Sequence, residues 1–268
     1  MPETALPNFD MIRLDLRGSV AVLTLNRPQR LNAAPPQMFA EIHDALRALP
    51  GLAARALLIT GEGRAFCSGA DVQNMGSTSG SRGENTRKVL TEVYSPVMLA
   101  LSQLPMPVLA AVNGVAAGIG CSLALAADFT LAARSAYFLE AFVNIGLVPD
   151  GGATWMLARQ VGKARATEMM MLGERLPAER AEQWGLIYRA VDDDELMTQA
   201  LALAERLANG PTLALGLMRR GLALALSQSY EDAMAAEAVH QGQAADSADA
   251  AEGGRAFLER RKAVFKGA

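Results

Sequence analysis

The chain has 268 residues, a formal net charge of −3 and a composition that is 51% hydrophobic and 20% charged. This composition is ordinary for a globular protein and excludes a disordered chain, and the negative charge gives no support for a nucleic-acid partner. Two cysteines, Cys67 and Cys121, and two histidines, His43 and His240, are too few for a disulfide scaffold or a Cys/His metal site. Residues 1–10 lack a signal pattern and no long uncharged apolar run occurs, so we expect a cytoplasmic protein without a membrane partner.

The first two-thirds of the chain alternate between β-rich and helical stretches. Met11–Leu16 and Ser19–Leu25 flank Arg17-Gly18 and predict a hairpin. The elements predicted next are a helix at Pro36–Leu49, a strand at Ala56–Thr60, a helix at Thr86–Leu104, a strand at Val108–Val112, a helix at Gly118–Ala127, and extended structure at Phe129–Ala132 and Phe138–Val148. The polar stretch Gly76–Asn85 predicts a flexible loop, which is either an inert surface loop or a segment that covers a ligand.

From Gly151 onward the periodicity is almost wholly helical, with the exception of a predicted strand at Leu186–Val191. The predicted helices are Ala153–Val161, Lys163–Leu172, Pro177–Trp184, Asp194–Ala208, Pro211–Leu226, Tyr230–Ser247 and Gly253–Phe265. The pattern as a whole predicts an α/β core over residues 1–200 and a helical module over residues 201–268. Because the C-terminal helices are rich in Ala, Leu and Met, we expect them to pack against another subunit.

The last 18 residues differ in charge from the rest of the chain. Residues 251–268 carry five basic side chains against two glutamates, a net charge of +3, which leaves −6 for residues 1–250. The basic residues are Arg255, Arg260, Arg261, Lys262 and Lys266. Such an end is either a solvated helix face or a surface that binds a phosphorylated ligand or an acidic neighbouring subunit.

Two turns rich in small residues each follow a predicted buried strand. The first is Gly63–Asp71 (GRAFCSGAD) and the second is Asn113–Gly120 (NGVAAGIG), which opens a predicted helix. Small residues let a ligand carbonyl approach main-chain N–H groups, and a helix N-terminus favours developing negative charge. The two turns are therefore either an oxyanion hole or two tight strand–helix connections.

Other catalytic motifs are absent or incomplete around these turns. Gly118-Ile119-Gly120 lacks the third glycine of a dinucleotide-binding turn, because Leu123 stands in its place. Neither Ser68 nor Ser122 lies in a G-x-S-x-G elbow, and no P-loop pattern occurs. These absences disfavour nucleotide-dependent oxidoreduction and serine hydrolysis.

With Leu25–Pro28 before them and Gly146–Ala153 after them, the two turns resemble the crotonase family of enoyl-CoA hydratases and isomerases. The similarity runs from about residue 11 to Lys266. It implies a spiral of ββα units with a C-terminal helical trimerisation module, a homotrimer or dimer of trimers, an acyl-CoA substrate and no cofactor. The chemistry that it implies is stabilisation of a thioester enolate between two backbone N–H groups, which match Ala70 and Ile119.

The resemblance also implies a binding site for the CoA moiety. The matching positions near the first turn are Arg30, Arg64 and Ser68, and those near the C-terminus are Phe257 and Arg260. The basic tail would then neutralise CoA phosphates, including those of a ligand bound to a neighbouring subunit. A solvated face remains the alternative for Arg261 and Lys266.

The reaction depends on which carboxylates reach the substrate. Hydratases of the family use two glutamates, whose positions here match Ser122 and Phe142. Asp150 ends a largely apolar run, which would raise its pKa and suit a general base, although it is equally placed to cap the following helix. Glu140 is a second candidate base, with a surface or structural role as the alternative.

The run 145–150 and Thr154-Trp155 resemble the branch of the family that isomerises epoxyphenylacetyl-CoA in phenylacetate degradation, whose catalytic aspartate matches Asp150. Dehalogenases of the family also place an aspartate there, but this chain has Phe142 where they have a tryptophan. The sequence thus predicts an acyl-CoA isomerase for ring expansion of that epoxide or for conversion of a 3-enoyl-CoA into a 2-enoyl-CoA. The alternatives are an enoyl-CoA hydratase with altered acid/base residues and a non-catalytic acyl-CoA-binding protein.

Overall fold

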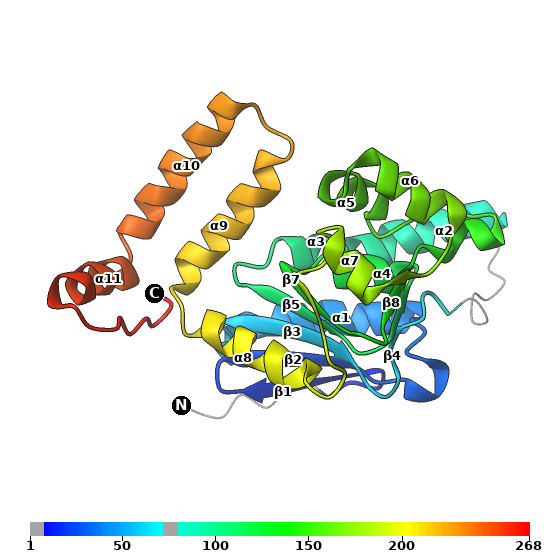
Figure 1. Cartoon of the computed structure of the whole chain (residues 1–268), viewed down its shortest axis with the longest axis horizontal. Coiled ribbons are helices and arrows are strands. Elements are labelled where there is room, and N and C mark those ends of the chain that lie inside the picture. The colour runs from blue at the N-terminus through cyan, green and yellow to red at the C-terminus, as the bar shows by residue number, and fades with distance from the viewer. Residues whose placement is uncertain (1–7, 72–79) are drawn as a thin grey trace.

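Long and short strands alternate along the chain and separate into two sheets (Figure 1). The computed structural model describes residues 8–71 and 80–268. The six-stranded sheet has the order β1 (Ile12–Arg17), β2 (Val20–Leu25), β3 (Ala56–Gly61), β5 (Val108–Val112), β7 (Phe129–Ala133) and β10 (Arg189–Val191). The four-stranded sheet has the order β4 (Ala65–Cys67), β6 (Val115–Ala117), β8 (Tyr137–Leu139) and β9 (Leu176–Pro177).

The connectivity of these strands is a spiral. β1 and β2 form the predicted antiparallel hairpin, and β2, β3, β5, β7 and β10 are parallel. After β3, β5 and β7 the chain crosses to the other sheet and forms β4, β6 and β8, which are parallel to one another. Each turn of the chain thus adds one strand to each sheet, and the predicted ββα spiral is confirmed.

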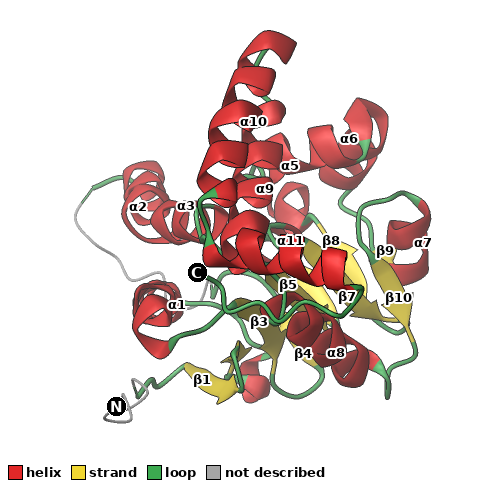
Figure 2. Cartoon of the chain, turned by 90° about the vertical axis from the view of Figure 1, so that its left-hand side faces the viewer, coloured by secondary structure: helices red, strands yellow, loops and turns green. Residues whose placement is uncertain are grey.

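Helices surround the sheets and continue beyond them (Figure 2). Their bounds are α1 (Pro36–Ala48), α2 (Arg82–Val89), α3 (Ser95–Ser102), α4 (Ile119–Leu125), α5 (Ala153–Gln160), α6 (Gly162–Leu172), α7 (Ala178–Gln183), α8 (Leu196–Ala208), α9 (Thr212–Ala225), α10 (Tyr230–Ala245) and α11 (Ala248–Glu259). Short 3₁₀ turns occupy Pro28–Arg30 (η1), Leu49–Leu52 (η2) and Ala141–Ile145 (η5), and a π-helical turn occupies Leu90–Tyr94 (η4). All seven residues of α4 are buried, and α8 packs on β3, β5 and β7.

The prediction of a loop over Gly76–Asn85 is wrong for its last residues, which belong to α2. The first residues of this stretch lie outside the described residues. Ser81 caps α2 through a capping box with Glu84, so the helix begins at Arg82 rather than at Thr86. The predicted single helix also contains the π-helical turn just before Pro96, whose ring cannot continue regular α-helical hydrogen bonding.

Extended structure over Phe138–Val148 is wrong beyond β8. The chain turns into η5 and then reaches Gly146, which has a φ of +70°. Apolar side chains of this run point outward: Ile145 is 61% and Val148 81% exposed. The apolar run therefore does not form extended structure beyond β8.

The last three helices form an extension of the core. Figure 1 shows α9 and α10 as an antiparallel pair that projects from the body, with α11 following α10 at the base of the pair, near the start of α9. α11 is shifted from the predicted Gly253–Phe265, because Ser247 caps its start and Arg260 ends it with a φ of +54°. The helical C-terminal module is thus present, while the division after residue 200, which falls inside α8, stays a prediction. In the described part of the chain, no helix is long and apolar enough to cross a membrane.

Candidate active site

The turn after β4 and the turn after β6 lie against each other. β4 and β6 are parallel neighbours, so their carboxyl ends meet at one edge of the sheet. Gly69 and Gly118 have φ values of +107° and +52°. A β-carbon added to Gly118 would lie 3.8 Å from the Gly69 Cα, and one added to Gly69 would lie 3.2 Å from the Ala117 carbonyl oxygen. Glycine at both positions allows this approach.

The two turns present main-chain donors without an acceptor in the part of the chain that the structure describes. Ile119 is the first residue of α4, where an N–H has no partner within the helix. Within residues 8–71 and 80–268, neither the Ile119 N–H nor the Ala70 N–H has a protein acceptor. Two such donors on adjacent turns are candidates for an oxyanion hole.

Main-chain and side-chain hydrogen bonds from distant segments hold the first turn in place. The Ala34 N–H donates to the Gly69 carbonyl at 2.8 Å, and the Ala34 carbonyl accepts from the Asp71 N–H at 3.1 Å. The Tyr94 hydroxyl donates to the same Ala34 carbonyl at 2.9 Å. The buried Asp71 carboxylate pairs with the Arg27 guanidinium at 3.1 Å. Ala70 therefore lies in a stretch of backbone that is fixed from both sides.

The sequence did not indicate these supporting roles. Arg27 and Asp71 are both part of the motifs that carried the resemblance, and a charged residue directly after a small-residue turn is the one local sign of the pair. Tyr94 has no such sign, because its contact with Ala34 depends on how η4 packs on the core.

Asp150 lies beside the second turn. The Ser122 hydroxyl donates to the Asp150 main-chain carbonyl at 2.9 Å. A β-carbon on Gly151, which has a φ of +63°, would lie 2.4 Å from Ile119 Cδ1 and 2.8 Å from Ser122 Cβ. The loop that carries Asp150 thus contacts the first turn of α4 directly.

The Asp150 side chain does not cap the next helix. The N-cap of α5 is Gly152, without a side-chain cap, and only the main-chain carbonyl of Asp150 accepts the Ala153 N–H. The buried Oδ1 of Asp150 has no hydrogen-bond partner among the described residues. Burial raises the pKa of this carboxyl to about 6. A carboxyl with this pKa can take up and release a proton near neutral pH.

Glu140 is fully buried, so a surface role is wrong. Neither of its carboxylate oxygens has a partner at normal hydrogen-bond geometry in the described part of the chain. Burial, with a smaller contribution from the charge of Asp150, raises the pKa of Glu140 to about 7, although its interaction with the Cys121 thiol opposes the shift.

The two positions that match the hydratase glutamates carry no carboxylate. Ser122 is fully buried and donates to the Asp150 carbonyl. Phe142 is buried beside the second turn, with its Cζ 3.6 Å from the place of a β-carbon on Gly118. The surroundings of the second turn are therefore apolar where a second acid would stand.

The predicted CoA-binding residues fall into two groups. Near the first turn, Ser68 donates its N–H to the Leu31 carbonyl, half-exposed Arg30 lies 3.9 Å from Asp71, and Arg64 is exposed. Phe257, which is 83% exposed, and Arg260 lie at the end of α11, beyond the α9–α10 pair and away from α4 (Figure 1). Within one chain the structure does not bring the second group to the turns.

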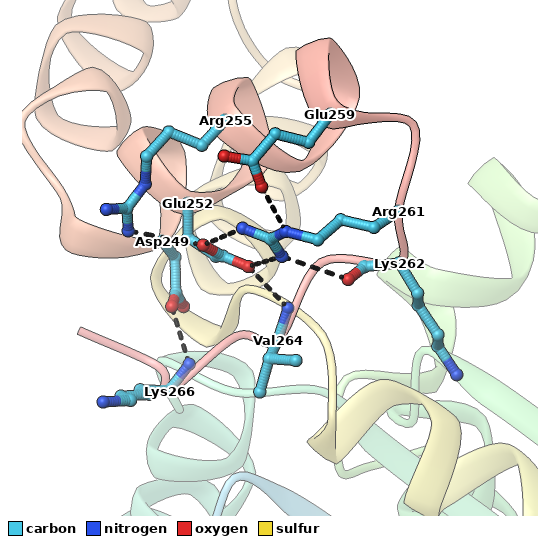
Figure 3. A network of polar contacts seen from close by, with 8 residues as sticks. All are labelled: Asp249, Glu252, Arg255, Glu259, Arg261, Lys262, Val264 and Lys266. Atoms are coloured by element: carbon cyan, nitrogen blue, oxygen red, sulfur yellow. Dashed lines mark hydrogen bonds and ion pairs between the residues drawn. The ribbon is translucent and has the colours of Figure 1, made fainter.

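The basic tail is partly neutralised from within (Figure 3). Arg261 donates to Glu252 at 2.6 and 3.0 Å and to Glu259. These contacts lower the pKa of Glu252 to about 2. The Asp249 carboxylate accepts the main-chain N–H of Lys266 at 2.6 Å, while the Lys262 side chain points away from the network. Arg261 therefore holds the tail against α11, and whether it also contacts CoA phosphate stays a prediction.

Comparison with known proteins identifies the family. The enoyl-CoA hydratase/isomerase family model matches residues 15–268. The "Probable enoyl-CoA hydratase" of Rhodobacter capsulatus is 44% identical over 260 residues, and the 1,2-epoxyphenylacetyl-CoA isomerase of Escherichia coli is 41% identical over 260 residues. Each alignment covers 97% of this chain and 99% of the relative. The crystal structure of enoyl-CoA hydratase subunit I from Geobacillus kaustophilus HTA426 matches with a TM-score of 0.90 at 36% identity, covering 97% of this chain and 99% of that chain.

The chain therefore belongs to the enoyl-CoA hydratase/isomerase family, and the resemblance seen in its sequence is confirmed. It is an enzyme of that family, with the fold of its solved members. The names of the relatives include both a hydratase and an isomerase.

The buried Asp150 carboxyl gives a prediction about stability. Its pKa is raised from 3.8 to about 6, so the native state binds a proton more tightly than the unfolded chain. Stability from this group is therefore full below about pH 4 and is lost as pH rises through about pH 6. The wild type should lose this stability between about pH 4 and pH 8, whereas Asp150→Asn should not. We therefore expect the unfolding free energy of the variant, relative to that of the wild type, to rise by on the order of 2 kcal/mol over this range.

Urea unfolding across this pH range measures the difference. Asp194→Asn is the matched control, because Asp194 is exposed in the turn before α8. A constant difference between Asp150→Asn and the wild type across the range would show that Asp150 is not buried as described.

Proposed function

We propose that this enzyme is an acyl-CoA isomerase that stabilises a thioester enolate between the Ala70 and Ile119 N–H groups and uses Asp150 as its acid/base. The observation that carries the proposal is the contact of the Asp150 loop with the first turn of α4, at a site where Ser122 and Phe142 replace the hydratase glutamates. The 41% identity to an enzyme named 1,2-epoxyphenylacetyl-CoA isomerase supports the same reading.

In the proposed mechanism the thioester oxygen accepts both N–H groups. These hydrogen bonds strengthen as negative charge moves onto the oxygen, which acidifies the α-carbon. Asp150 takes the α-proton, and the electron pair left on carbon delocalises onto the thioester oxygen as an enolate. For a 3-enoyl-CoA, Asp150 then returns the proton to the γ-carbon, and the double bond moves to the 2-position. No atom is gained or lost overall.

For a ring epoxide of a phenylacetyl-CoA, the same oxyanion donors and the same base support expansion of the ring to an oxepin. Phe142 keeps the site apolar, which favours proton transfer within the substrate over attack by water. The proposed chemistry uses no metal or redox cofactor, since the chain supplies both donors and the base.

The CoA moiety is proposed to bind along the first turn. Arg30, 3.9 Å from Asp71, and exposed Arg64 offer guanidinium groups, and Ser68 precedes Ala70 by two residues. Because α11 lies away from α4 within one chain, we propose that Phe257 in its last turn and Arg260 directly after it serve the site of a neighbouring subunit. A guanidinium there would contact CoA phosphate.

A hydratase is the second candidate, favoured by the 44% identity to a relative named as a probable enoyl-CoA hydratase. It would have to add water with Asp150 in place of both glutamates. A hydratase adds water to crotonyl-CoA and removes the conjugated double bond of its thioester. The loss of absorbance that results measures hydration and distinguishes it from isomerisation. A non-catalytic binding protein would show neither reaction and no exchange of α-protons.

Asp150→Asn tests the base. The variant keeps the shape of the side chain but cannot take up a proton at neutral pH, so we expect the isomerisation rate to fall by roughly 10²–10⁴-fold. Exchange of the α-protons with deuterated solvent should fall in parallel, while the affinity for a CoA thioester stays close to that of the wild type. Asp194→Asn again serves as the control. A variant that isomerises a 3-enoyl-CoA at the wild-type rate would remove Asp150 from the mechanism.

Ile119→Pro tests the oxyanion hole. Proline is well tolerated at the first position of a helix, where Ile119 stands, and it removes the N–H together with the isoleucine side chain. Losing one such donor should raise the activation free energy by roughly 2.7–4 kcal/mol. Ile119→Ala, which keeps the N–H, is the matched control and should be far less affected. Equal kcat values for the proline and alanine variants of comparable fold would refute the assignment.

The assembly of the enzyme is also open to a direct test. Apolar side chains remain exposed on the helical module: Met218, Leu222, Met234 and Val239 are 52–72% exposed in the single chain. We propose that these helices join subunits, so that the protein sediments as a trimer or a dimer of trimers. Analytical ultracentrifugation at micromolar concentration measures this, and a stable monomer would exclude the shared CoA site.

A further inference from the structure

Glu140 is a buried carboxyl that the proposed proton transfer does not use. Its side chain is 0% exposed, and in the described part of the chain neither carboxylate oxygen finds a hydrogen-bond donor at normal geometry. Buried carboxylates are nearly always paired, because removing a charge from water without compensation is strongly disfavoured. The position of Glu140 is therefore hard to explain if the group is ionised.

Glu140 lies behind the same helical turn that Asp150 contacts. It follows β8 directly and is the N-cap residue of η5, and the Leu139 carbonyl before it accepts the Gly118 N–H at 2.8 Å. The Cys121 thiol of α4 interacts with the Glu140 carboxyl, while Ser122 of the same turn donates to the Asp150 carbonyl. One turn of α4 thus contacts both the Glu140 carboxyl and the main chain of the loop that carries Asp150.

The titratable groups that act on Glu140 are Cys121, from α4, and Asp150, from the loop before α5. The Cys121 thiol stays protonated, since burial and the neighbouring Glu140 raise its pKa well above the usual value. Burial raises the pKa of Asp150 to about 6 and that of Glu140, which is completely buried and has both oxygens unpartnered in the described chain, to about 7, with a contribution from the charge of Asp150. Two interacting acids of this kind titrate as a pair.

We propose that Glu140 is a positioning residue that works in its protonated form: it keeps the buried side of the site at one negative charge, carried by Asp150, and its ionisation slows the reaction. This inference rests on the proposed isomerase function. In this proposal Glu140 keeps its proton throughout the reaction, and Asp150 exchanges a proton with the substrate.

Two physical effects make ionised Glu140 unfavourable for the reaction. A second charge at the first turn of α4 opposes the charge that develops on the thioester oxygen at the Ile119 N–H. The charged group would also have to draw in water or move the junction of β8 and η5, which holds Gly118 and leads to Asp150. Both effects disappear when the side chain cannot ionise.

Glu140→Gln tests the proposal through the pH dependence of kcat/KM for a 3-enoyl-CoA. In the wild type we expect kcat/KM to fall above the titration of Glu140, by about tenfold per pH unit at its steepest. Glu140→Gln is permanently neutral, so this alkaline fall should be missing and its kcat/KM should exceed that of the wild type at high pH. Glu205→Gln, on the exposed face of α8, is the matched control and should keep the wild-type profile. Coincident profiles for Glu140→Gln and the wild type overturn the proposal.

Infrared difference spectroscopy gives a readout that needs neither substrate nor turnover. At neutral pH the wild type should show the C=O stretch of a protonated buried carboxyl, which the control variant keeps and which Glu140→Gln loses. Glu140→Leu, also unable to ionise, replaces the glutamine variant if the buried amide prevents folding. A wild type that lacks the band, or a band unchanged in both Glu140 variants, overturns the proposal. If the wild type fails to isomerise a 3-enoyl-CoA, the proposed function fails, and the band alone decides the state of Glu140.

Discussion

Parallel pairing of β4 with β6 brings two chain turns into van der Waals contact, and the remaining features of the site depend on that contact. Gly69 and Gly118 adopt positive φ values at the place where the turns meet, and a side chain at either would crowd the other turn. Among the described residues the N–H groups of Ala70 and Ile119 find no acceptor, and that of Ile119 belongs to the first turn of α4, where a helix cannot satisfy it. Both groups are therefore free to serve as the donors of the proposed site.

Close backbone approach also brings the proposed base to these donors. A β-carbon on Gly120 would lie 2.5 Å from the Cys67 carbonyl oxygen, so α4 packs directly on the first turn. Gly151 fits against Ile119 in the same way on the side of the Asp150 loop. Three segments that are far apart in the sequence can meet around α4 only because a glycine stands at each contact. Main-chain contacts thus determine the geometry of the candidate site, and they also position the loop that carries the Asp150 carboxyl.

The sequence predicted the parts of this arrangement that depend on local pattern. Buried strands such as β3 and β5 were found within a residue of their ends, because continuous apolar runs between turn signals are typical of parallel strands. The two turns were found from their small residues, and the resemblance gave Ala70 and Ile119 roles that chain composition alone left open. η5 was missed because the run of apolar residues after β8 was interpreted as extended structure, although several of these residues are exposed. The complete burial of Glu140 was missed for a related reason, since burial is decided by packing between elements that a single sequence does not order in space.

Burial raises the pKa of both carboxyls to which the proposed chemistry gives a role. Asp150 and Glu140 have no charged partner in the described part of the chain, and both lie near α4, whose residues are all buried. Their ionisation is disfavoured in the folded state, so each lowers stability as pH rises, and each titrates nearer to neutral pH than an exposed carboxyl would. Phe142 extends the apolar surroundings to the position of a hydratase acid. With few polar groups to hold water and one negative charge between two acids, the proposed site favours moving a proton from one carbon of the acyl chain to another over the addition of a hydroxyl.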